Sequence, residues 1–434
     1  MDNWKYAAIG AAVGTAIVAA VSVLAKERES ASRLRDGQSW YRQRRHDRAL
    51  AEFELAIKAD PANAEAHRYR GSALRALGRH EEALASLEEA ARLNPDHAGT
   101  HTNMGYALRG LGRHEEALVA FGHAIGLNPD GPAAHTGAGR ALLSLGRHEE
   151  ALDAFERALE IDQCLAIAHL SKGQALGRLG RHEEALEAFG HATRLDEENS
   201  SAHRGAGDAL FCLGRHEEAL EEFKLAASLD PGNAEAHMGC GYANEGLGNH
   251  EGALEAFGLA ASLDPGNDEA HMGCGYANEG LGNHEGALEA FGLAASLDPG
   301  NDEAHMGCGY ANEGLGNHEG ALEAFGQSAK LDPSNSEAHI CRGRALNSLG
   351  RFEEALVAFG HAASLDPDNA SAHLGVARAQ LSLQHVAEAN MAFRRAARLD
   401  PGLERLARRR GQDPEGGSAT GALAFPKFPP SWRF

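Results

Sequence analysis

The hydrophobic pattern of this chain repeats every 34 residues from residue 30 to residue 403, with no insertion or deletion between repeats. Residues 64–97 illustrate it. Two apolar stripes with helical spacing occur there, first Ala66, Gly71, Ala73, Leu74 and Leu77, then Ala83, Leu84, Leu87, Ala90, Ala91 and Leu93. Gly78 and Arg79 separate them. Each of the eleven repeats is therefore predicted to be a helical hairpin that buries its apolar faces against its neighbours.

A turn signal ends each hairpin. Asn94, Pro95 and Asp96 follow the second stripe, and most other repeats have a proline at the same place, because proline cannot continue a helix. Gln163 and Glu197 replace this proline in two repeats. We expect these two turns to be looser than the others.

The repeat resembles a known family. Gly71, Ala83, Leu87, Ala90 and Pro95 stand where the tetratricopeptide repeat family places its glycine, alanines, large apolar residue and proline. The resemblance covers residues 30–403. It implies an all-α fold, a right-handed α-solenoid of eleven 34-residue helix-turn-helix repeats, and a surface for protein partners. No catalytic motif such as G-x-S-x-G, H-E-x-x-H or a Walker loop occurs, so no enzymatic activity is expected.

Residues 6–25 form a run of twenty uncharged residues ahead of the repeats. As a helix, this run is about 30 Å long, which is enough to cross a bilayer. We expect an uncleaved transmembrane helix between a short flank, residues 1–5, and a basic juxtamembrane linker, residues 26–29. Two alternatives stay open: a secretory signal cleaved after Ala25, which would make the repeats secreted or periplasmic, and a helix that caps the repeats.

Charges beside this run predict its orientation. Residues 26–48 carry eight Lys or Arg, whereas Lys5 is the only basic residue before the run. The positive-inside rule then predicts a single-pass membrane protein with its repeats in the cytoplasm. Gly10 and Gly14 form a G-x-x-x-G pattern, of the kind that lets two membrane helices pack as a homodimer.

The acidic charge of the chain is concentrated in three repeats. The formal net charge is −21, and repeats 7–9, residues 234–335, hold 17 Asp or Glu against one basic residue, Lys330. This balance gives no indication of a nucleic acid partner. The surface is either a solvated acidic face that keeps the chain soluble or a binding surface for a basic partner.

The family resemblance implies which residues line such a surface, because positions 2, 5, 9 and 12 of the first helix commonly meet ligands. In repeats 7–9 these are Glu235, Met238, Tyr242, Glu245, Glu269, Met272, Tyr276, Glu279, Glu303, Met306, Tyr310 and Glu313. Earlier repeats would supply a basic half of the groove with Arg68, Arg75, Arg109, Arg140 and Arg204. We expect the acidic half to favour a basic or amphipathic protein segment, with Tyr and Met adding apolar contact. The Lys and Asn clamp with which some members grip acidic tails is missing, since Asn103 has no clamp lysine beside it.

Other polar residues follow the repeat and do not indicate a reactive site. Histidines recur at repeat positions 4 and 17, from His67 to His373 and from His46 to His318, where we expect partly buried packing groups with depressed pKa values. The spacing favours neither a metal site nor any other cofactor. Cysteines at equivalent positions of successive repeats are too far apart for disulfides, so free thiols are expected. Asn244, Asn278 and Asn312 replace an interior leucine and are expected to weaken repeats 7–9 unless they find partners.

After the repeats, residues 404–410 are expected to extend the last hairpin as a charged cap, and residues 411–434 to be a disordered tail rich in Pro and aromatic residues. We therefore predict a non-enzymatic, membrane-tethered scaffold or adaptor that binds a protein or peptide partner. Two alternatives are a targeting or transport receptor for basic or amphipathic segments and a regulatory subunit of an enzyme encoded elsewhere.

Overall fold

The computed structural model describes residues 3–403, and of residues 3–20 it describes only the helical backbone. The chain divides into two compact units, Met1–Arg215 and His216–Phe434. All regular secondary structure among the described residues is α-helical, which confirms the predicted all-α fold of helix pairs. The right-handed sense of the array stays a prediction.

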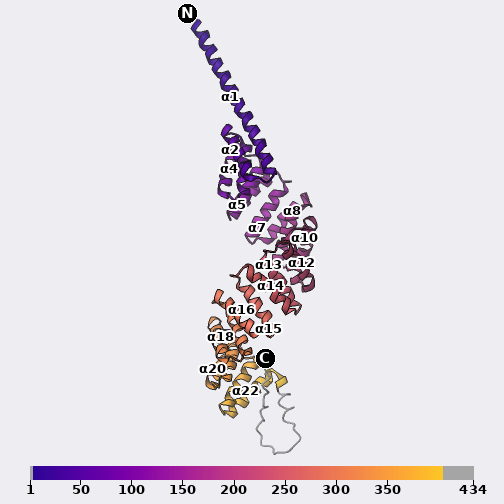
Figure 1. Ribbon diagram of the computed structural model, residues 1–434, viewed down its shortest axis with the longest axis vertical. Helices are drawn as coiled ribbons and strands as arrows, with labels where there is room; N and C mark the ends of the chain where they lie inside the picture. Colours follow the sequence, from indigo (N-terminus) through magenta and orange to yellow (C-terminus); the bar gives the residue numbers. More distant parts are fainter. Residues whose placement is uncertain (1–2, 404–434) are drawn as a thin grey trace, which may run out of the picture. The chain divides into compact units, whose positions relative to one another are not determined.

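The first unit holds five helix pairs and the first helix of a sixth (Figure 1). Its helices are α1 (Asn3–Arg42), α2 (His46–Ala59), α3 (Ala64–Ala76), α4 (His80–Leu93), α5 (Ala98–Gly110), α6 (His114–Leu127), α7 (Pro132–Ser144), α8 (His148–Ile161), α9 (Ala166–Arg178), α10 (His182–Leu195) and α11 (Ser200–Cys212).

The second unit continues with the same helix lengths. Its helices are α12 (His216–Leu229), α13 (Ala234–Gly246), α14 (His250–Leu263), α15 (Asp268–Gly280), α16 (His284–Leu297), α17 (Asp302–Gly314), α18 (His318–Leu331), α19 (Ser336–Ser348), α20 (Phe352–Leu365), α21 (Ala370–Ser382) and α22 (Val386–Leu399). In both units each helix packs against the next one in the chain, and each odd-numbered helix also contacts the next odd-numbered one.

The tight turn inside each hairpin depends on a left-handed residue. Gly78 has φ of 76°, and it lets Arg79 N donate to Leu74 O at 2.9 Å, which satisfies a carbonyl at the end of α3. Glycine recurs at this place with φ between 70° and 76° in nine repeats. Arg44 and Gln384 occupy it in the first and last repeats, with φ of 59° and 64°.

The turns between hairpins do not depend on proline. In the ordinary case His101 Nε2 forms a hydrogen bond with Pro95 O at 2.8 Å. His169 makes the same bond to Gln163 O at 3.1 Å, and His203 to Glu197 O at 3.2 Å. The two repeats without proline therefore keep the local hydrogen bond, and their helices end at the same repeat position, contrary to our expectation of looser turns.

A buried phenylalanine forms the core of most repeats, and in at least five of them it lies between two glycines. The Phe121 ring is fully buried, and a Cβ placed on Gly105 or Gly137 would lie 2.6 Å or 2.4 Å from it. Gly105 belongs to the same repeat and Gly137 to the next, so the ring locks consecutive hairpins together. Repeat position 8 holds glycine in this repeat because a larger side chain would collide with the ring.

Asparagines inside repeats 7–9 form hydrogen bonds through both the nitrogen and the oxygen of their side-chain amides. Asn244 Nδ2 donates to Cys240 O at 2.8 Å, and Asn244 Oδ1 accepts from Asn249 Nδ2 at 2.7 Å. Asn278 and Asn312 make the equivalent bonds. The expected weakness of these repeats therefore does not follow from the asparagines, because each finds partners.

The first helix runs past the start of the repeats. α1 is one continuous helix of 40 residues that extends beyond α2 (Figure 1), and the boundaries predicted at residues 25 and 29 fall inside it. Ser30 is fully buried and its hydroxyl donates to Ala56 O at 2.9 Å, where packing against α2 begins.

Within the described part of the chain, no helix is both long enough and apolar enough to span a bilayer. Only the helical backbone is described at Gly10 and Gly14, so their predicted packing is not tested, and the predicted cap and tail at residues 404–434 lie outside the described residues.

Candidate functional site

The odd-numbered helices of the second unit carry a ladder of tyrosines and glutamates. Tyr242 on α13 donates to Glu269 on α15 at 2.5 Å, and Tyr276 donates to Glu303 on α17 at 2.5 Å. Tyr310 donates to Glu337 on α19 at 2.8 Å. Each tyrosine thus reaches position 2 of the following repeat, so the ladder ties successive repeats together along one face.

The aromatic rings of this ladder pack against buried phenylalanines. Tyr242 and Tyr276 stand edge-on to Phe257 and Phe291, with ring centroids 5.1 Å and 5.2 Å apart. Burial raises the pKa of both phenols, and the hydrogen bond to the carboxylate and its charge raise it further. The phenols therefore stay protonated and act as donors, which orients the carboxylates.

Three further glutamates lie at position 12 of the same helices. Glu245, Glu279 and Glu313 are partly buried in the last turns of α13, α15 and α17. A helix C-terminus disfavours negative charge. We name these three residues and the tyrosine ladder the acidic face.

Their surroundings differ. Glu313 pairs with Arg344 on α19, and Glu279 Oε1 lies 3.2 Å from His284 Nδ1. Glu245 has no hydrogen-bond or ion-pair partner among the described residues. Burial raises the pKa of its carboxyl group, and the charge of His250 opposes this rise without cancelling it. The acidic face thus contains a half-buried carboxylate whose negative charge is uncompensated by contact.

The predicted methionines do not line this surface. Met238, Met272 and Met306 were expected at exposed positions, but they are only 7%, 7% and 8% exposed. Each belongs to an apolar cluster with a phenylalanine, such as Met238 with Phe257. Position 5 points into the packing between repeats, so these side chains serve the core and leave the acidic face to Glu and Tyr.

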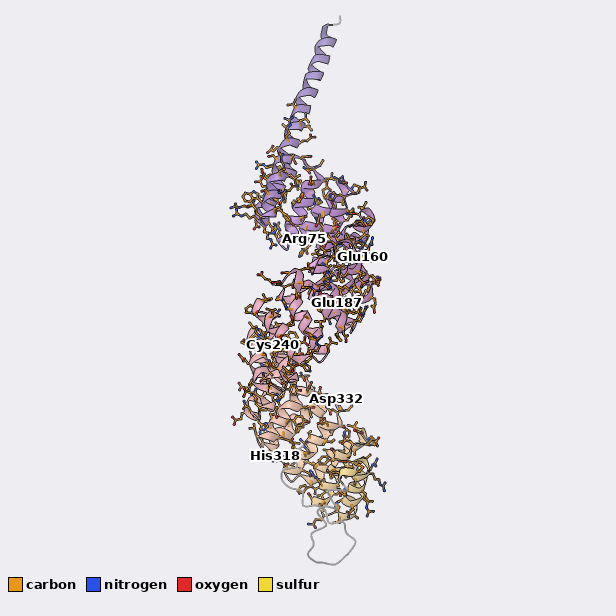
Figure 2. The ribbon with its side chains drawn as sticks, turned by 90° about the vertical axis from the view of Figure 1, so that its right-hand side faces the viewer. Arg75, Glu160, Glu187, Cys240, His318 and Asp332 are labelled. Carbon is orange, nitrogen blue, oxygen red and sulfur yellow. The ribbon has the colours of Figure 1, made fainter. Side chains whose placement is uncertain are left out.

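The predicted basic residues of the first unit separate into two kinds. Arg68 lies 3.4 Å from Glu65, and Arg204 lies 3.1 Å from Asp208, so both have acidic partners. The other three come together on successive odd-numbered helices: Arg75, Arg109 and Arg140. Figure 2 marks Arg75 within the first unit and Cys240 within the second.

Sequence reasoning missed Glu337 and Arg344. Glu337 has the same repeat position as Glu235, Glu269 and Glu303, which was a usable signal. Arg344 stands in the tenth repeat where the three preceding repeats have tyrosine, and it closes the acidic face by pairing with Glu313.

Cysteines and histidines do not form a reactive centre in the described part of the chain. All six cysteines are free, and burial raises the pKa values of Cys240 and Cys341 to about 11, which leaves them as weakly reactive thiols. Among the described residues, no group of three His, Cys, Asp or Glu is placed to hold a metal ion.

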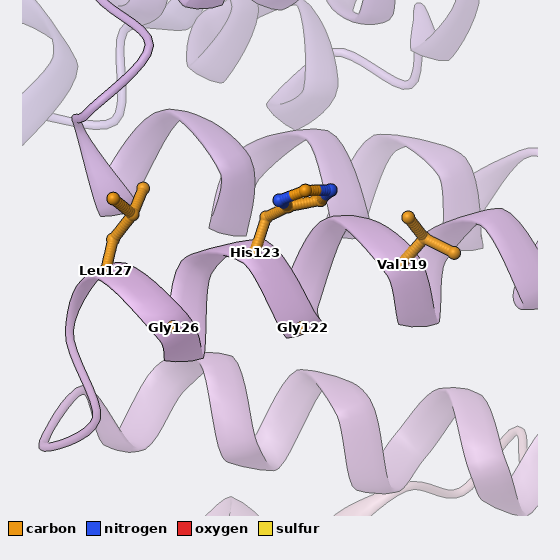
Figure 3. A pocket seen from close by; sticks show the side chains of 5 residues that line it. All are labelled: Val119, Gly122, His123, Gly126 and Leu127. Atoms are coloured by element: carbon orange, nitrogen blue, oxygen red, sulfur yellow. The ribbon is translucent and has the colours of Figure 1, made fainter.

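A shallow hollow lies on α6 of the first unit. Figure 3 shows Val119, His123 and Leu127 projecting from the same side of this helix, with Gly122 and Gly126 between them. Val119 is 62% exposed, and the hollow has no buried polar group aimed into it. It is a surface feature of one helix without the charges of a binding site.

Family models of the tetratricopeptide repeat match residues 34–98, 102–163, 170–234, 225–268, 241–302, 272–338 and 309–363. Two further models, described as tetratricopeptide repeat and TPR repeat, match residues 133–198 and 343–384. All of the matching models are models of repeats. No curated protein matches the sequence.

Several solved structures are similar to this chain. YrrB, described as a TPR protein with an unusual peptide-binding site, is 27% identical with a TM-score of 0.39, over 44% of this chain and 97% of YrrB. A tetratricopeptide repeat protein from Parabacteroides merdae is 18% identical with a TM-score of 0.45, over 58% of this chain and 99% of its own. Yeast Tom70 is 16% identical with a TM-score of 0.38, over 90% of this chain and 98% of its own.

The repeat models cover well over half of the sequence, and the described helices pair as the repeat pattern requires. This chain therefore belongs to the tetratricopeptide repeat family, whose repeats build scaffolds for protein–protein interaction.

Proposed function

We propose that this protein is a scaffold that binds a basic or amphipathic segment of a partner protein on the acidic face of its second unit. Glu245 carries the proposal. Its carboxylate is half-buried, lies at a helix C-terminus, and contacts no cation among the described residues. A Lys or Arg side chain of a partner would supply the missing positive charge.

The tyrosine ladder supports the same proposal. Tyr242 and Tyr276 hold Glu269 and Glu303 in place, so these carboxylates lose little side-chain freedom when a ligand binds. Tyr276 is 39% exposed and presents an aromatic ring beside the carboxylates. Such a surface offers a cation both ion pairs and contact with aromatic rings.

The test is binding of a fluorescently labelled amphipathic peptide that carries lysines on one face, compared with its glutamine counterpart. We expect the double variant Glu245→Gln/Glu279→Gln to bind the lysine peptide about tenfold more weakly, because two charged contacts are lost. The variant is expected to fold, since the ionised Glu245 is poorly solvated in the free protein.

The matched control is Glu255→Gln/Glu289→Gln, which removes the same charge from exposed positions of α14 and α16. We expect this control to change affinity by less than about twofold, since exposed charges contribute little. Equal weakening by both double variants would show that only the net charge of the unit matters, and would refute a site on the acidic face.

We further propose that residues 6–25 tether the scaffold to a membrane, with the repeats on the cytoplasmic side. The support is the uncharged run itself and the basic residues that follow it. The test is flotation with lipid vesicles of the full chain and of a chain that begins at Lys26. Flotation of the full chain alone is expected, and equal flotation of both chains would contradict the tether.

A further inference from the structure

Three arginine side chains of the first unit lack acidic partners. Arg75 lies on α3, Arg109 on α5 and Arg140 on α7, and these helices follow one another in successive repeats. Among the described residues, none of the three guanidinium groups forms an ion pair or a hydrogen bond, although the sequence holds 62 acidic residues against 41 Lys and Arg. We name these three residues the arginine cluster.

A second arginine in each of the same repeats is fully paired. Arg79 donates through Nε and Nη2 to Glu82, both at 2.7 Å. Arg113 forms the same two-bonded pair with Glu116, and Arg147 with Glu150. Carboxylates are therefore available in these repeats. The arginine cluster lacks partners because of where its side chains lie in the fold.

The cluster lies beside a fixed aromatic ring, whose phenol is influenced by the charges of all three arginines. The guanidinium carbon of Arg75 lies 5.4 Å from the ring centroid of Tyr106 on α5. Tyr106 donates its hydroxyl to Ala133 O at 2.8 Å and stands edge-on to Phe121. The Tyr106 ring is therefore held in a fixed position next to Arg75, and its hydroxyl already has a hydrogen-bond acceptor.

Polar atoms of the cluster are buried without partners. The Nε atoms of Arg75 and Arg109 are both buried and make no hydrogen bond. Native proteins rarely leave such donors unsatisfied, because the lost hydration is not replaced. The C-terminal turns of α3 and α5 favour the positive charge, but they do not satisfy these nitrogen atoms.

Electrostatics shows that the three charges act on one another. Burial lowers the pKa of the Arg109 guanidinium, and the positive charges of Arg140 and Arg75 lower it further. The free protein thus holds like charges together in partly buried positions. An anion bound among them would relieve both the repulsion and the unsatisfied donors.

We propose that Arg75, Arg109 and Arg140 form a binding site for the side-chain carboxylates of an acidic segment in a partner protein. Guanidinium groups present paired donors that match a carboxylate. Packed helices lie about 8–10 Å apart, so arginines on three successive repeats suit carboxylates spaced along a segment better than one small anion. The net charge of −21 disfavours a long polyanion such as RNA.

The arginine cluster differs from the acidic face of the proposed function in the unit that carries it and in the sign of its charge. The acidic face belongs to the second unit and would bind a basic segment, whereas the arginine cluster belongs to the first unit and would bind an acidic one. Peptides of opposite charge and variants in different units therefore distinguish failure of one proposal from failure of the other.

The test uses the full chain and a fluorescently labelled octapeptide of alternating glutamate and alanine, amidated at its C-terminus so that only side-chain carboxylates are present. We expect Arg109→Gln to weaken binding about tenfold, since a charge-assisted contact is lost. Arg109→Lys, which keeps the charge and the fold but loses the paired donors, is expected to weaken binding about threefold.

The matched control is Arg113→Gln, which removes an arginine that is already paired with Glu116 on the same hairpin. We expect this variant to keep the affinity within about twofold. Equal weakening by Arg113→Gln and Arg109→Gln, or equal binding of the octapeptide in which glutamine replaces glutamate, would overturn the proposal. Tighter binding of an eight-nucleotide oligouridine, lost in Arg109→Gln, would overturn it in favour of a nucleic acid site.

Discussion

Glycine has two different roles in the helices of this chain, and the surroundings of each glycine decide which role it has. Gly105 on α5 lies against the Phe121 ring, where an added Cβ would come within 2.6 Å. Gly122 on α6 has no atom within 4 Å of an added Cβ. The first glycine is required by packing, whereas the second leaves the helix more flexible than alanine would.

We therefore predict opposite effects for the same substitution. Gly105→Ala should lower the free energy of unfolding by about 1–3 kcal/mol, because the ring must move to admit the methyl group. Gly122→Ala should raise it by about 0.5–1 kcal/mol, because alanine favours the helix. Urea denaturation of both variants tests this, and destabilisation by Gly122→Ala would contradict it.

At the scale of helices, repeats 7–9 join the two helices of a hairpin differently from most other repeats. In the second repeat Leu74 is buried and Arg79 pairs with Glu82 at the start of the second helix. In the seventh repeat Asn244, Asn249 and Gly252 replace these three residues. Asn249 bonds to Asn244 and accepts from Gly252 N at 3.2 Å, so it caps α14.

The three residues are expected to act as a unit. Asn244→Leu should destabilise the fold by about 1–2 kcal/mol, because Asn249 loses its acceptor in a partly buried site. The triple variant Asn244→Leu/Asn249→Arg/Gly252→Glu, which restores the arrangement of the second repeat, should recover most of that loss. Thermal denaturation measures both, and additive losses in the triple variant would show that the residues are independent.

Across the whole molecule, both units contain a histidine pair that couples folding to pH. The rings of His169 and His191 stack at 4.9 Å in the first unit. Burial lowers the pKa of His169, and the charges of His191, Lys172 and Arg194 lower it further, against the hydrogen bond to Gln163.

The second unit has the corresponding pair, His339 and His361, with ring centroids 4.3 Å apart. Burial lowers the pKa of His339, His361 and Arg342 lower it further, and the bond to Pro333 and the charge of Asp332 oppose this. The sequence predicted depressed pKa values for the repeated histidines, and His169 and His339 are the two at which the structure bears this out.

Stability should therefore fall on acidification. An unfolded histidine has a pKa of about 6.5, so below that pH the unfolded chain binds more protons than the folded one. The folded state keeps its full stability above about pH 6.5, where these histidines are neutral in both states. It loses stability as the pH falls from there toward the lower pKa values of the folded state. We expect a lower unfolding temperature at about pH 5.5 than at about pH 7.5. The variant His169→Gln/His339→Gln should show a smaller difference in unfolding temperature between the two pH values. An unchanged difference would show that these histidines do not cause the pH dependence.

Much of the fold follows from the sequence because helices obey local rules. The spacing of apolar residues, the glycine of each inner turn and the 34-residue period are properties of neighbouring residues in the chain. They were sufficient to predict the helix pairs. The proline at the outer turn was given too much weight, since Gln163 supplies the same backbone carbonyl to a histidine.

Tertiary structure decided which residues make up the acidic face and the arginine cluster. Repeat position predicted that Glu245 and Arg109 would lie on the first helix of a hairpin, but not that Met238 would be buried or that Tyr242 would bond to Glu269 in the next repeat. These outcomes depend on which side chain of a neighbouring helix fills the adjacent space. The period of a sequence determines helices and their order, whereas burial and charge pairing depend on contacts between helices that the period does not specify.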